Sequence, residues 1–329
     1  MKKIINQPEN VVDEMINGIV RSNSQLLERV PNTNVIKQIN IPNQVALVSG
    51  GGSGHEPAHA GFVGDGMLQA AVCGEVFTSP TSDQVYEAIK AVDQGQGVLL
   101  IIKNYSGDIM NFEMAQELAE MDDIKVGKVI VDDDIAVEDS TFTQGKRGVA
   151  GTVLVHKILG SAARAGASLD ELVELGQQVV ANIKTVGVAL TGATVPEVGQ
   201  PGFVLADDEI EFGVGIHGEP GYRKEKLTTS KEMASEIVEK LEAAFNWEEN
   251  EAVGILVNGM GGTPLMEQFV FFNDSYQLLA DKNLHIDFTK VGNFMTSIEM
   301  QGLSLTVIRL ADANWLEHLE ADVTTANWI

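Results

Sequence analysis

Residues 45–59 read VALVSGGGSGHEPAH, an apolar run with β-branched residues that leads directly into four glycines and a histidine. Such a run predicts a buried strand over residues 45–49, and the glycines after it let the backbone approach a ligand closely. Similar runs predict strands over residues 70–76, 97–103 and 128–132. Because amphipathic segments separate these strands, the first half predicts a mostly parallel sheet with helices on both faces.

Capping signals and helical spacing predict the helices that connect these strands. Thr81 and Gln84 lie three residues apart, as in a capping box, at the start of a stretch whose apolar residues recur every three or four positions. Ser168 and Glu171 have the same spacing before another such stretch. Helices are therefore expected over residues 81–94, 111–121, 149–165 and 169–183.

The second half of the sequence has a different pattern. Residues 190–201 combine glycines with prolines, a composition typical of a connection between domains. Strands are expected over residues 210–216, 253–257, 285–291 and 303–310, with helices near residues 230–245 and 264–282. No helix separates the last two strands, which favours a mixed or antiparallel sheet.

The predicted fold is an α/β protein with two domains. The first comprises residues 1–189 and carries the glycine-rich stretch, whereas the second comprises residues 190–329 and is a smaller, mixed or antiparallel α/β domain. A length of 329 residues is enough for two cores, at roughly 150 residues per domain. The C-terminal tail is free to pack back on the first domain.

Composition limits the partners that the chain can bind. With 47 acidic and 22 basic residues, the formal net charge of -25 repels nucleic acids and anionic membranes, so neither is an expected partner. The single cysteine, Cys73, cannot form an intrachain disulfide and fits a reducing cytoplasm. Its apolar surroundings predict a buried structural thiol. No signal peptide or membrane span is expected, because polar residues break every long apolar run.

Three segments that follow predicted strands carry chemically useful side chains. The first contains His55, Glu56 and His59, which match the HExxH pattern of zinc peptidases. Pro57 argues against a zinc site, because proline is tolerated only in the first turn of the helix that would have to carry both histidines. The segment also lacks the lysine of a phosphate-binding loop and the third glycine of the dinucleotide fingerprint. No metal ion is expected on this chain.

The second segment is KNYSGD, residues 103–108, directly after an apolar strand. Lys103 could donate to a substrate oxygen, and Asp108 could accept a proton from a substrate hydroxyl. Alternatively, Asp108 only caps the next helix.

The third segment is GVGIHGEPG, residues 213–221. Its glycines leave the imidazole of His217 sterically open, and a neutral imidazole nitrogen can add to a ketone carbon. Covalent catalysis by His217 is therefore one interpretation, and a solvated histidine in a surface turn is the other.

Other polar residues are interpreted as structural. His156 falls within an apolar helix, and His285 and His318 lie in ordinary surroundings. The run VDDD ends in three aspartates, residues 132–134, that cannot all point at one magnesium ion from a regular strand. It is interpreted as a hydrated strand end.

Several motifs, taken together and in chain order, closely resemble the dihydroxyacetone-binding K subunit of dihydroxyacetone kinases. They are GGGSGHEP, GEVFTSPT, LLIIKNYSGD, VDDD, GKRGVAGT, EFGVGIHGEPG and GLSL. The likeness runs from the first predicted strand to residues 302–305, so it covers almost the whole chain.

This resemblance implies the roles of the site residues. His217 would form a covalent hemiaminal with the carbonyl of dihydroxyacetone, while His55 and Asp108 would be the acid/base pair that removes the proton from the attacking hydroxyl. The expected substrate contacts are Gly52, Ser53, Gly54, His55, Lys103 and Asp108. A histidine that traps ketones would exclude glycerol, which has no carbonyl.

The resemblance also implies the partners of the chain. No nucleotide is expected here, because ADP or ATP with magnesium would be held by a separate L subunit. Phosphoenolpyruvate would supply the phosphoryl group through a phosphotransferase-type M subunit. A cytoplasmic homodimer is expected.

Two other classes of protein remain open at this point. A non-enzymatic paralogue that senses dihydroxyacetone and acts as a transcriptional coactivator would need His217 but not the acid/base pair. A lipid- or metabolite-binding protein of related fold would not need His217 either.

Overall fold

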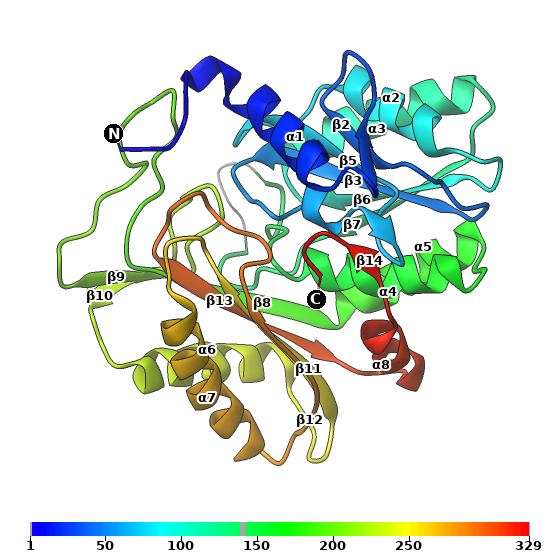
Figure 1. Cartoon of the computed structure of the whole chain (residues 1–329). Coiled ribbons are helices and arrows are strands. Elements are labelled where there is room, and N and C mark those ends of the chain that lie inside the picture. Colours follow the sequence, from blue (N-terminus) through cyan, green and yellow to red (C-terminus); the bar gives the residue numbers. More distant parts are fainter. Residues whose placement is uncertain (1, 139–142, 329) are drawn as a thin grey trace.

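The computed structural model describes residues 2–138 and 143–328, and its strands form two six-stranded sheets (Figure 1). The first sheet has the order β1-β2-β5-β3-β6-β7. Its strands are Leu27–Arg29 (β1), Val35–Gln38 (β2), Ala46–Ser53 (β3), Ala70–Val76 (β5), Val98–Lys103 (β6) and Val126–Val131 (β7). β3, β5, β6 and β7 run parallel, which confirms the mostly parallel sheet, and β1 and β2 add an antiparallel edge.

Helices cover both faces of this first sheet. α2 (Ser82–Val92) and α3 (Ser106–Met121) share one apolar cluster with the strands, and α1 (Val11–Ser22), α4 (Thr152–Arg164) and α5 (Leu169–Ala181) share another. The run from Thr152 to Ala163 in α4 is buried on all sides. The cluster around it continues to Leu256 and Ile308 of the second sheet, so one core joins the two sheets.

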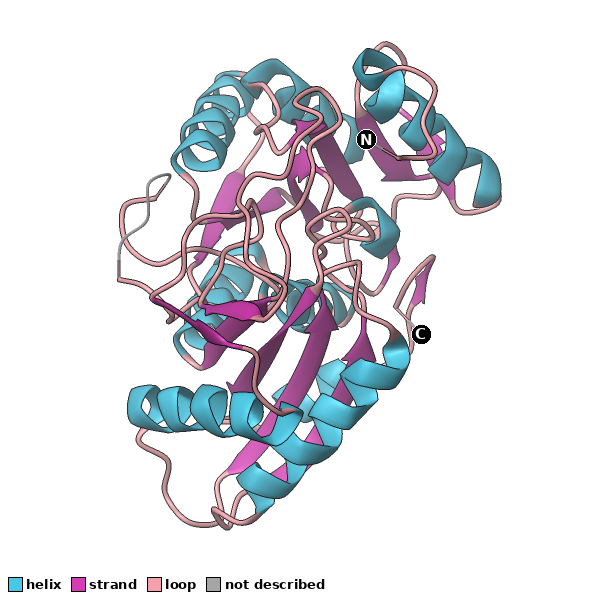
Figure 2. Ribbon diagram, turned by 90° about the vertical axis from the view of Figure 1, so that its left-hand side faces the viewer, coloured by secondary structure: helices cyan, strands magenta, loops and turns pink. Residues whose placement is uncertain are grey.

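The second sheet is mixed, as the sequence predicts. Its order is β10-β9-β8-β13-β11-β12, and only β11 and β12 are parallel neighbours. Its strands are Ile183–Ala189 (β8), Glu209–Phe212 (β9), Arg223–Lys226 (β10), Ala252–Gly259 (β11), His285–Gly292 (β12) and Gly302–Arg309 (β13). α6 (Ser230–Phe245) and α7 (Leu265–Ala280) cover its outer face, in the lower half of Figure 2.

The two halves of the chain are interleaved in space. β8 precedes the boundary predicted at residue 189, yet it pairs with β13 and β9 in the second sheet. The boundary itself stays a prediction. After α8 (Ala313–Glu320), the C-terminal segment returns to the first half, where β14 (Thr324–Thr325) pairs with β4 (Gly64–Asp65).

Local details correct one predicted capping box and one predicted helix start. The capping box of Ser168 and Glu171 is present, but Thr81 makes no side-chain cap. Gln84 instead accepts a hydrogen bond from the backbone N–H of Asn34, at 2.7 Å. α3 begins at Ser106 rather than near residue 111, so the KNYSGD segment runs from the last residue of β6 into the first turn of α3.

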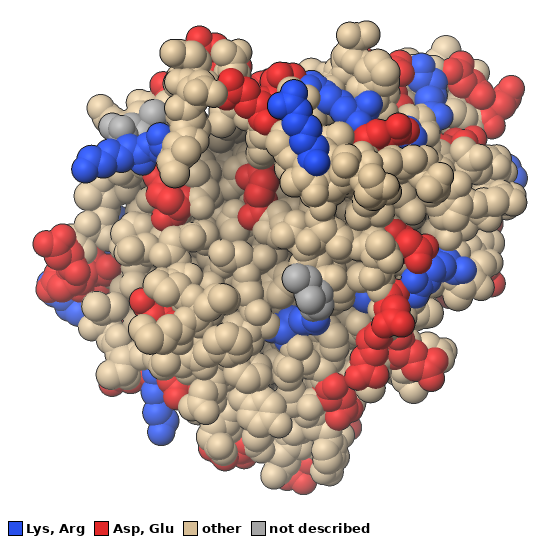
Figure 3. All heavy atoms as spheres, viewed as in Figure 1, with Lys and Arg blue, Asp and Glu red and all other residues tan. Residues whose placement is uncertain are grey.

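The surface agrees with the acidic composition. In Figure 3, acidic side chains are spread around the outline of the molecule, and most of the face between them is uncharged. Within the described ranges, no helix combines the length and the apolar character that crossing a bilayer requires.

Candidate active site

The three segments selected from the sequence meet where three strands end. β3 leads into His55, β6 leads into the first turn of α3, and β9 leads into the loop of His217. Between them lies a cavity of about 590 Å³, whose wall includes Gly52, Phe77, Tyr105, Asp108, Asn111 and His217. In open α/β sheets ligands bind at the carboxyl ends of the strands, where this cavity lies.

The glycine-rich stretch is part of a strand rather than a loop. β3 continues through Ser53, and its glycines pair with β5. A Cβ atom on Gly50 would lie 2.5 Å from the carbonyl oxygen of Val72, and one on Gly52 would lie 2.5 Å from the backbone nitrogen of Thr78. These glycines therefore allow close backbone packing, and Gly52 also borders the cavity.

Glu219 contacts both the backbone N–H and the imidazole of His217. The backbone N–H of His217 donates to Oε2 of Glu219 at 2.9 Å, and the imidazole Nδ1 lies 3.2 Å from Oε1. Burial alone would raise the pKa of Glu219, but the hydrogen bond and charge of His217, together with the charge of Arg147, lower it to about 2. The carboxylate is thus ionised and accepts the Nδ1 proton, which leaves Nε2 as the nitrogen of His217 that faces away from Glu219.

His55 faces Nε2 of His217. Its Nε2 lies 3.0 Å from Nε2 of His217, and its Nδ1 lies 2.7 Å from the carbonyl oxygen of Thr296. His55 is buried, and burial followed by the positive charges of His217 and Lys103 holds its pKa well below the ordinary value. The two imidazoles are therefore in direct contact, although they are 162 positions apart in the chain.

Aromatic rings fix the orientation of His217. The ring of Tyr105 lies edge-on to the imidazole with centroids 4.6 Å apart, and the ring of Phe77 lies edge-on at 5.1 Å. Phe77 also stacks on His55 with a centroid separation of 5.0 Å. Among the described residues, the buried hydroxyl of Tyr105 has no hydrogen-bond partner.

Lys103 and Asp108 form a buried ion pair. Nζ of Lys103 lies 3.1 Å from Oδ2 of Asp108 and donates to the carbonyl oxygen of Gly50 at 3.2 Å. The N-cap position of α3 is Tyr105, so Asp108 does not cap this helix. Asp108 borders the cavity, whereas Lys103 is not part of the cavity wall.

Ser53 and Gly54 face away from this cavity. Oγ of Ser53 donates to the carbonyl oxygen of Gly74 at 2.6 Å, and the N–H of Gly54 donates to the carboxylate of Glu56 at 3.0 Å. Both residues border a separate cavity of about 130 Å³. Of the predicted site residues, the structure thus brings together Gly52, His55, Lys103, Asp108 and His217.

The two histidines of the HExxH match have different partners. Nδ1 of His59 lies 2.8 Å from Nε2 of His156 in the core, whereas His55 contacts His217. Within residues 2–138 and 143–328 there is no group of three or more side chains suited to hold a metal ion.

The interpretation of the aspartate run as a hydrated strand end was wrong for Asp133 and Asp134, whereas Asp132 is exposed directly after β7. Asp133 accepts hydrogen bonds from the backbone N–H groups of Val149 and Gly151 at 2.7 and 2.8 Å, and Asp134 accepts one from Nε of Arg147 at 2.8 Å. Asp133, Asp134 and Arg147 are buried. Here the VDDD motif binds the GKRGVAGT motif and places Arg147 next to Glu219.

Sequence reasoning missed several residues of the site. Glu219 could have been predicted from the sequence, because it is a carboxylate two residues after a candidate catalytic histidine. Tyr105 and Phe77 lie inside motifs that were noted for other residues. Thr296 had no signal, because only the folded chain brings its carbonyl oxygen next to His55, 241 positions away.

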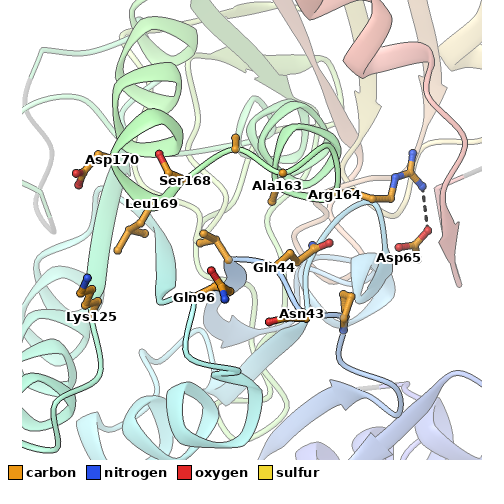
Figure 4. A pocket seen from close by; sticks show the side chains of 14 residues that line it. Asn43, Gln44, Asp65, Gln96, Lys125, Ala163, Arg164, Ser168, Leu169 and Asp170 are labelled. Atoms are coloured by element: carbon orange, nitrogen blue, oxygen red, sulfur yellow. Dashed lines mark hydrogen bonds and ion pairs between the residues drawn. The ribbon is translucent and has the colours of Figure 1, made fainter.

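A second cavity, of about 640 Å³, lies at the amino ends of the parallel strands of the first sheet (Figure 4). Its wall includes Val45, Gln96 and Lys125, which directly precede or lie just before the parallel strands β3, β6 and β7. Two of its charged side chains, Asp65 and Arg164, pair with each other at 2.9 Å. No histidine lines it, whereas His217 borders the first cavity, which is therefore the better candidate site.

Comparisons with known proteins agree with the sequence motifs. The model of the Dak1 domain family matches residues 17–327. The chain is 64% identical over 328 residues to the PTS-dependent dihydroxyacetone kinase, dihydroxyacetone-binding subunit DhaK, of Lactococcus lactis, and the match covers 99% of both chains. It is 59% identical to the subunit of the corresponding kinase 1 of Listeria innocua, over 100% of both chains.

A solved structure gives the same result for the fold. The dihydroxyacetone kinase operon co-activator DhaQ superposes with a TM-score of 0.91 at 44% sequence identity, over 96% of this chain and 97% of that one. These matches confirm the resemblance indicated by the motifs, and the chain belongs to the Dak1 family together with the dihydroxyacetone-binding subunits of dihydroxyacetone kinase.

Proposed function

We propose that this chain is the dihydroxyacetone-binding subunit of a dihydroxyacetone kinase, which captures the ketone on His217 and presents its hydroxyl to partner subunits. The main support is the setting of His217, whose Nδ1 is occupied by Glu219 at 3.2 Å while its ring borders the cavity. The identity of the substrate is inferred from the relatives named as such subunits, which are 64% and 59% identical to this chain.

Capture begins with the nitrogen that Glu219 leaves available. Nε2 of His217 adds to the carbonyl carbon of dihydroxyacetone, and the carbonyl oxygen becomes the hydroxyl of a hemiaminal. Glycerol has no carbonyl carbon and cannot form this bond, so the covalent step itself selects the substrate. The bond also fixes the remaining hydroxyl groups relative to the protein, which lowers the entropic cost of the next step.

His55 and Asp108 act on the hydroxyl that receives the phosphoryl group. Oδ2 of Asp108 accepts the hydrogen bond of Lys103, so Oδ1 remains to accept a proton from the substrate. His55 has a depressed pKa because of its burial, and its neutral imidazole can act as a base. A cavity of about 590 Å³ is much larger than a three-carbon ketone and leaves room for the donor's phosphoryl group.

The phosphoryl donor belongs to other chains in this proposal. An L subunit would hold ADP or ATP with magnesium and dock over the cavity, and an M subunit would pass on the phosphoryl group of phosphoenolpyruvate. The chain would work as a cytoplasmic homodimer. The name PTS-dependent, which both relatives carry, supports this source of the phosphoryl group.

Covalent capture can be tested on the isolated chain. Dihydroxyacetone labelled with carbon-13 at its carbonyl should lose the ketone signal on binding and gain that of a saturated carbon. Intact-mass spectrometry should show the whole mass of the ketone added, because addition releases no water. His217→Ala should abolish both signals, and glycerol should give neither. An adduct on another residue would contradict the proposal.

A ligand-sensing coactivator is the second candidate function. It is favoured by the likeness to the co-activator DhaQ, at a TM-score of 0.91. Such a protein would capture the ketone without phosphorylating it. Mixing the chain with L and M subunits and phosphoenolpyruvate should therefore yield dihydroxyacetone phosphate if the chain is the kinase subunit. Capture without turnover would favour the coactivator.

A further inference from the structure

Two motifs that the proposed function leaves unused contact the loop of His217, residues 213–221. The structure describes both VDDD, residues 131–134, and GKRGVAGT, residues 145–152, in full, and neither motif borders the cavity. Arg147 of the second motif donates from Nη2 to the carbonyl oxygen of Gly213 at 2.6 Å. Gly213 directly follows β9, so the first residue of the loop is bonded to a segment that follows β7 of the first sheet.

Asp134 holds the guanidinium of Arg147 in place. Nε and Nη2 of Arg147 lie 2.8 and 2.7 Å from Oδ2 of Asp134, and the backbone N–H of Asp134 donates to the carbonyl oxygen of Arg147 at 2.9 Å. Arg147 is 0% exposed and Asp134 is 2% exposed. A buried ion pair is often no more stabilising than apolar residues of the same volume. Stability alone therefore gives little reason for a charge at this position.

The third guanidinium nitrogen of Arg147 lies near Glu219, the residue that orients His217. Among the described residues, Nη1 of Arg147 has no hydrogen-bond partner. A Cβ atom on Gly215 would lie 2.9 Å from Nη1 and even closer to Oε2 of Glu219, so both atoms are near the same point of the loop. Burial raises the pKa of Glu219, but the hydrogen bond and charge of His217 and then the charge of Arg147 lower it to about 2.

We propose that Arg147 is a positioning residue for ketone capture: it fixes the loop of His217 through Gly213 and places a positive charge near Glu219, whose carboxylate orients the imidazole. Arg147 does not border the cavity, so it acts through these residues rather than on the ketone. The inference rests on the proposed function, because it explains how capture by His217 obtains its geometry. It also gives the VDDD and GKRGVAGT motifs a role in the reaction.

The shape of the guanidinium matters as much as its charge. One rigid plane directs two nitrogens to Asp134 and one of these also to Gly213, whereas the ammonium of a lysine is a point charge without this fork. A lysine at position 147 would therefore keep the charge near Glu219 and lose part of the bond pattern. The two contributions of Arg147 can thus be measured separately.

Few other charges act on Glu219. Tyr105 is neutral, because burial raises its pKa well above the usual value. Asp134 already pairs with Arg147. The titratable groups that face Arg147 and Glu219 come from the segments after β3, β6, β7 and β9; they are His55, Tyr105, Asp134 and His217.

Removal of the ion pair tests the effect on capture. Arg147→Met alone would leave the carboxylate of Asp134 buried without its partner, so the variant combines Arg147→Met with Asp134→Asn. Titration with carbonyl-labelled dihydroxyacetone should show an affinity lower by about ten-fold or more, because a displaced imidazole meets the carbonyl carbon in the wrong orientation. Arg147→Lys should lie between this double variant and the wild type. A double variant with wild-type affinity would overturn the proposal.

A ligand-free measurement distinguishes positioning from a merely structural role. With glutamate labelled at its carboxyl carbon, carbon-13 NMR follows the titration of Glu219, and Glu219→Gln assigns the signal. In the double variant Glu219 should titrate at a pH higher by about one unit or more, because burial then acts without the charge of Arg147. Arg147→Lys should keep the wild-type titration. An unchanged titration in the double variant would overturn the proposal.

Asp133→Asn is the matched control. Asp133 is buried in the same motif, but its carboxylate accepts hydrogen bonds from Val149, Gly151 and Thr185, none of which belongs to the loop of His217. This variant should lose stability in urea and keep both the affinity for the ketone and the titration of Glu219. A loss of affinity equal to that of the double variant would show general damage to packing and would overturn the proposal.

Failure of this inference can be told from failure of the proposed function. The titration of Glu219 uses no ketone, so its result does not depend on capture. If the wild type forms the His217 adduct and the double variant forms it equally well, the role of Arg147 alone is refuted. If the wild type forms no adduct, the proposed function is refuted, whatever the titration shows.

Discussion

Ser53 lies in the stretch predicted to bind the substrate, but its side chain is engaged within the protein. Its hydroxyl is buried and donates to the carbonyl oxygen of Gly74, at 2.6 Å. That bond ties the end of β3 to β5, next to His55. Any contact between Ser53 and the ligand would therefore have to use the backbone.

Ser53→Ala should destabilise the protein while leaving capture nearly intact. Loss of the hydroxyl leaves the buried carbonyl of Gly74 without this donor, which costs about 1–2 kcal/mol. Urea unfolding should show that loss, and the carbon-13 capture assay should show little change in affinity. A large loss of affinity with unchanged stability would mean that the hydroxyl itself contacts the ketone.

Two substitutions of Tyr105 separate the effect of its ring on ketone capture from that of its hydroxyl. The ring packs edge-on against His217, while no described residue pairs with the buried hydroxyl. Tyr105→Phe should keep capture and gain about 1 kcal/mol in unfolding free energy, since an unsatisfied polar group is removed. Tyr105→Leu should weaken capture, because His217 loses its edge-on neighbour. If Tyr105→Phe alone abolishes capture, the hydroxyl contacts the substrate.

The sequence predicted the candidate side chains but not the groups that orient them. His55, Lys103 and Asp108 lie at the carboxyl ends of the parallel strands β3 and β6, which are neighbours in the first sheet, whereas His217 follows β9 of the second sheet. The partners of these side chains are set by tertiary contacts, which no local pattern records. The burial of Asp133 is one such contact, because backbone N–H groups from a later loop satisfy its carboxylate.

Among the elements, the start of α5 shows a predicted capping box that is present in the structure. Oγ of Ser168 accepts the N–H of Glu171, whose carboxylate accepts the backbone N–H of Ser168 at 2.8 Å. Thr81 and Gln84 have the same spacing, but Gln84 is engaged by Asn34 of the neighbouring segment. Spacing alone could not separate the two cases, since a tertiary contact decides between them.

Alanine substitutions of Ser168 and Thr81 form a matched pair of variants. Ser168→Ala should lower the unfolding free energy by about 1 kcal/mol, because the backbone N–H of Glu171 loses its acceptor, the hydroxyl of Ser168. Thr81→Ala should have a smaller effect, since Thr81 makes no side-chain cap. Both residues are exposed, so neither change disturbs the core. Denaturant melts of the two variants under the same conditions give the comparison, and equal losses would contradict it.

Strand predictions succeeded where burial made the signal strong. β5 and β6 consist largely of apolar residues that are buried on both faces, and their bounds agree with the sequence to within a residue. β1 and β2 form a short antiparallel edge with charged residues and were missed. β3 was predicted to end at Ser49 because glycine is unfavourable in strands, but the close approach of β5 requires it there.

For the whole molecule, the main consequence is that the site depends on both halves of the chain. His55 follows a strand of the first sheet and His217 follows a strand of the second, so their 3.0 Å contact exists only when the sheets are correctly packed. The core around α4 provides that packing, since it joins apolar residues of both sheets. No single segment of sequence could have predicted the contact.

Lys157 lies within this joining core and makes its stability depend on pH. The side chain is fully buried in α4 and donates to the carbonyl oxygen of His318 in α8. Burial, followed by the positive charges of Arg164 and Lys290, lowers the pKa of Lys157 from 10.5 to about 8. The folded chain therefore releases this proton at a lower pH than the unfolded chain does.

The sign of the effect follows from proton linkage. Between pH 8 and 10.5 the unfolded state binds the proton and the folded state does not, so the folded state gains stability as pH rises through this window. Relative to Lys157→Met, the wild type should gain on the order of 3 kcal/mol across the window and nothing below it. Ser161→Ala also removes a contact to His318 but no charge, so its stability difference should stay constant. The stability of the three proteins should be measured by unfolding at several pH values, and a flat difference for Lys157→Met would show that the folded core holds this proton as strongly as the unfolded chain does.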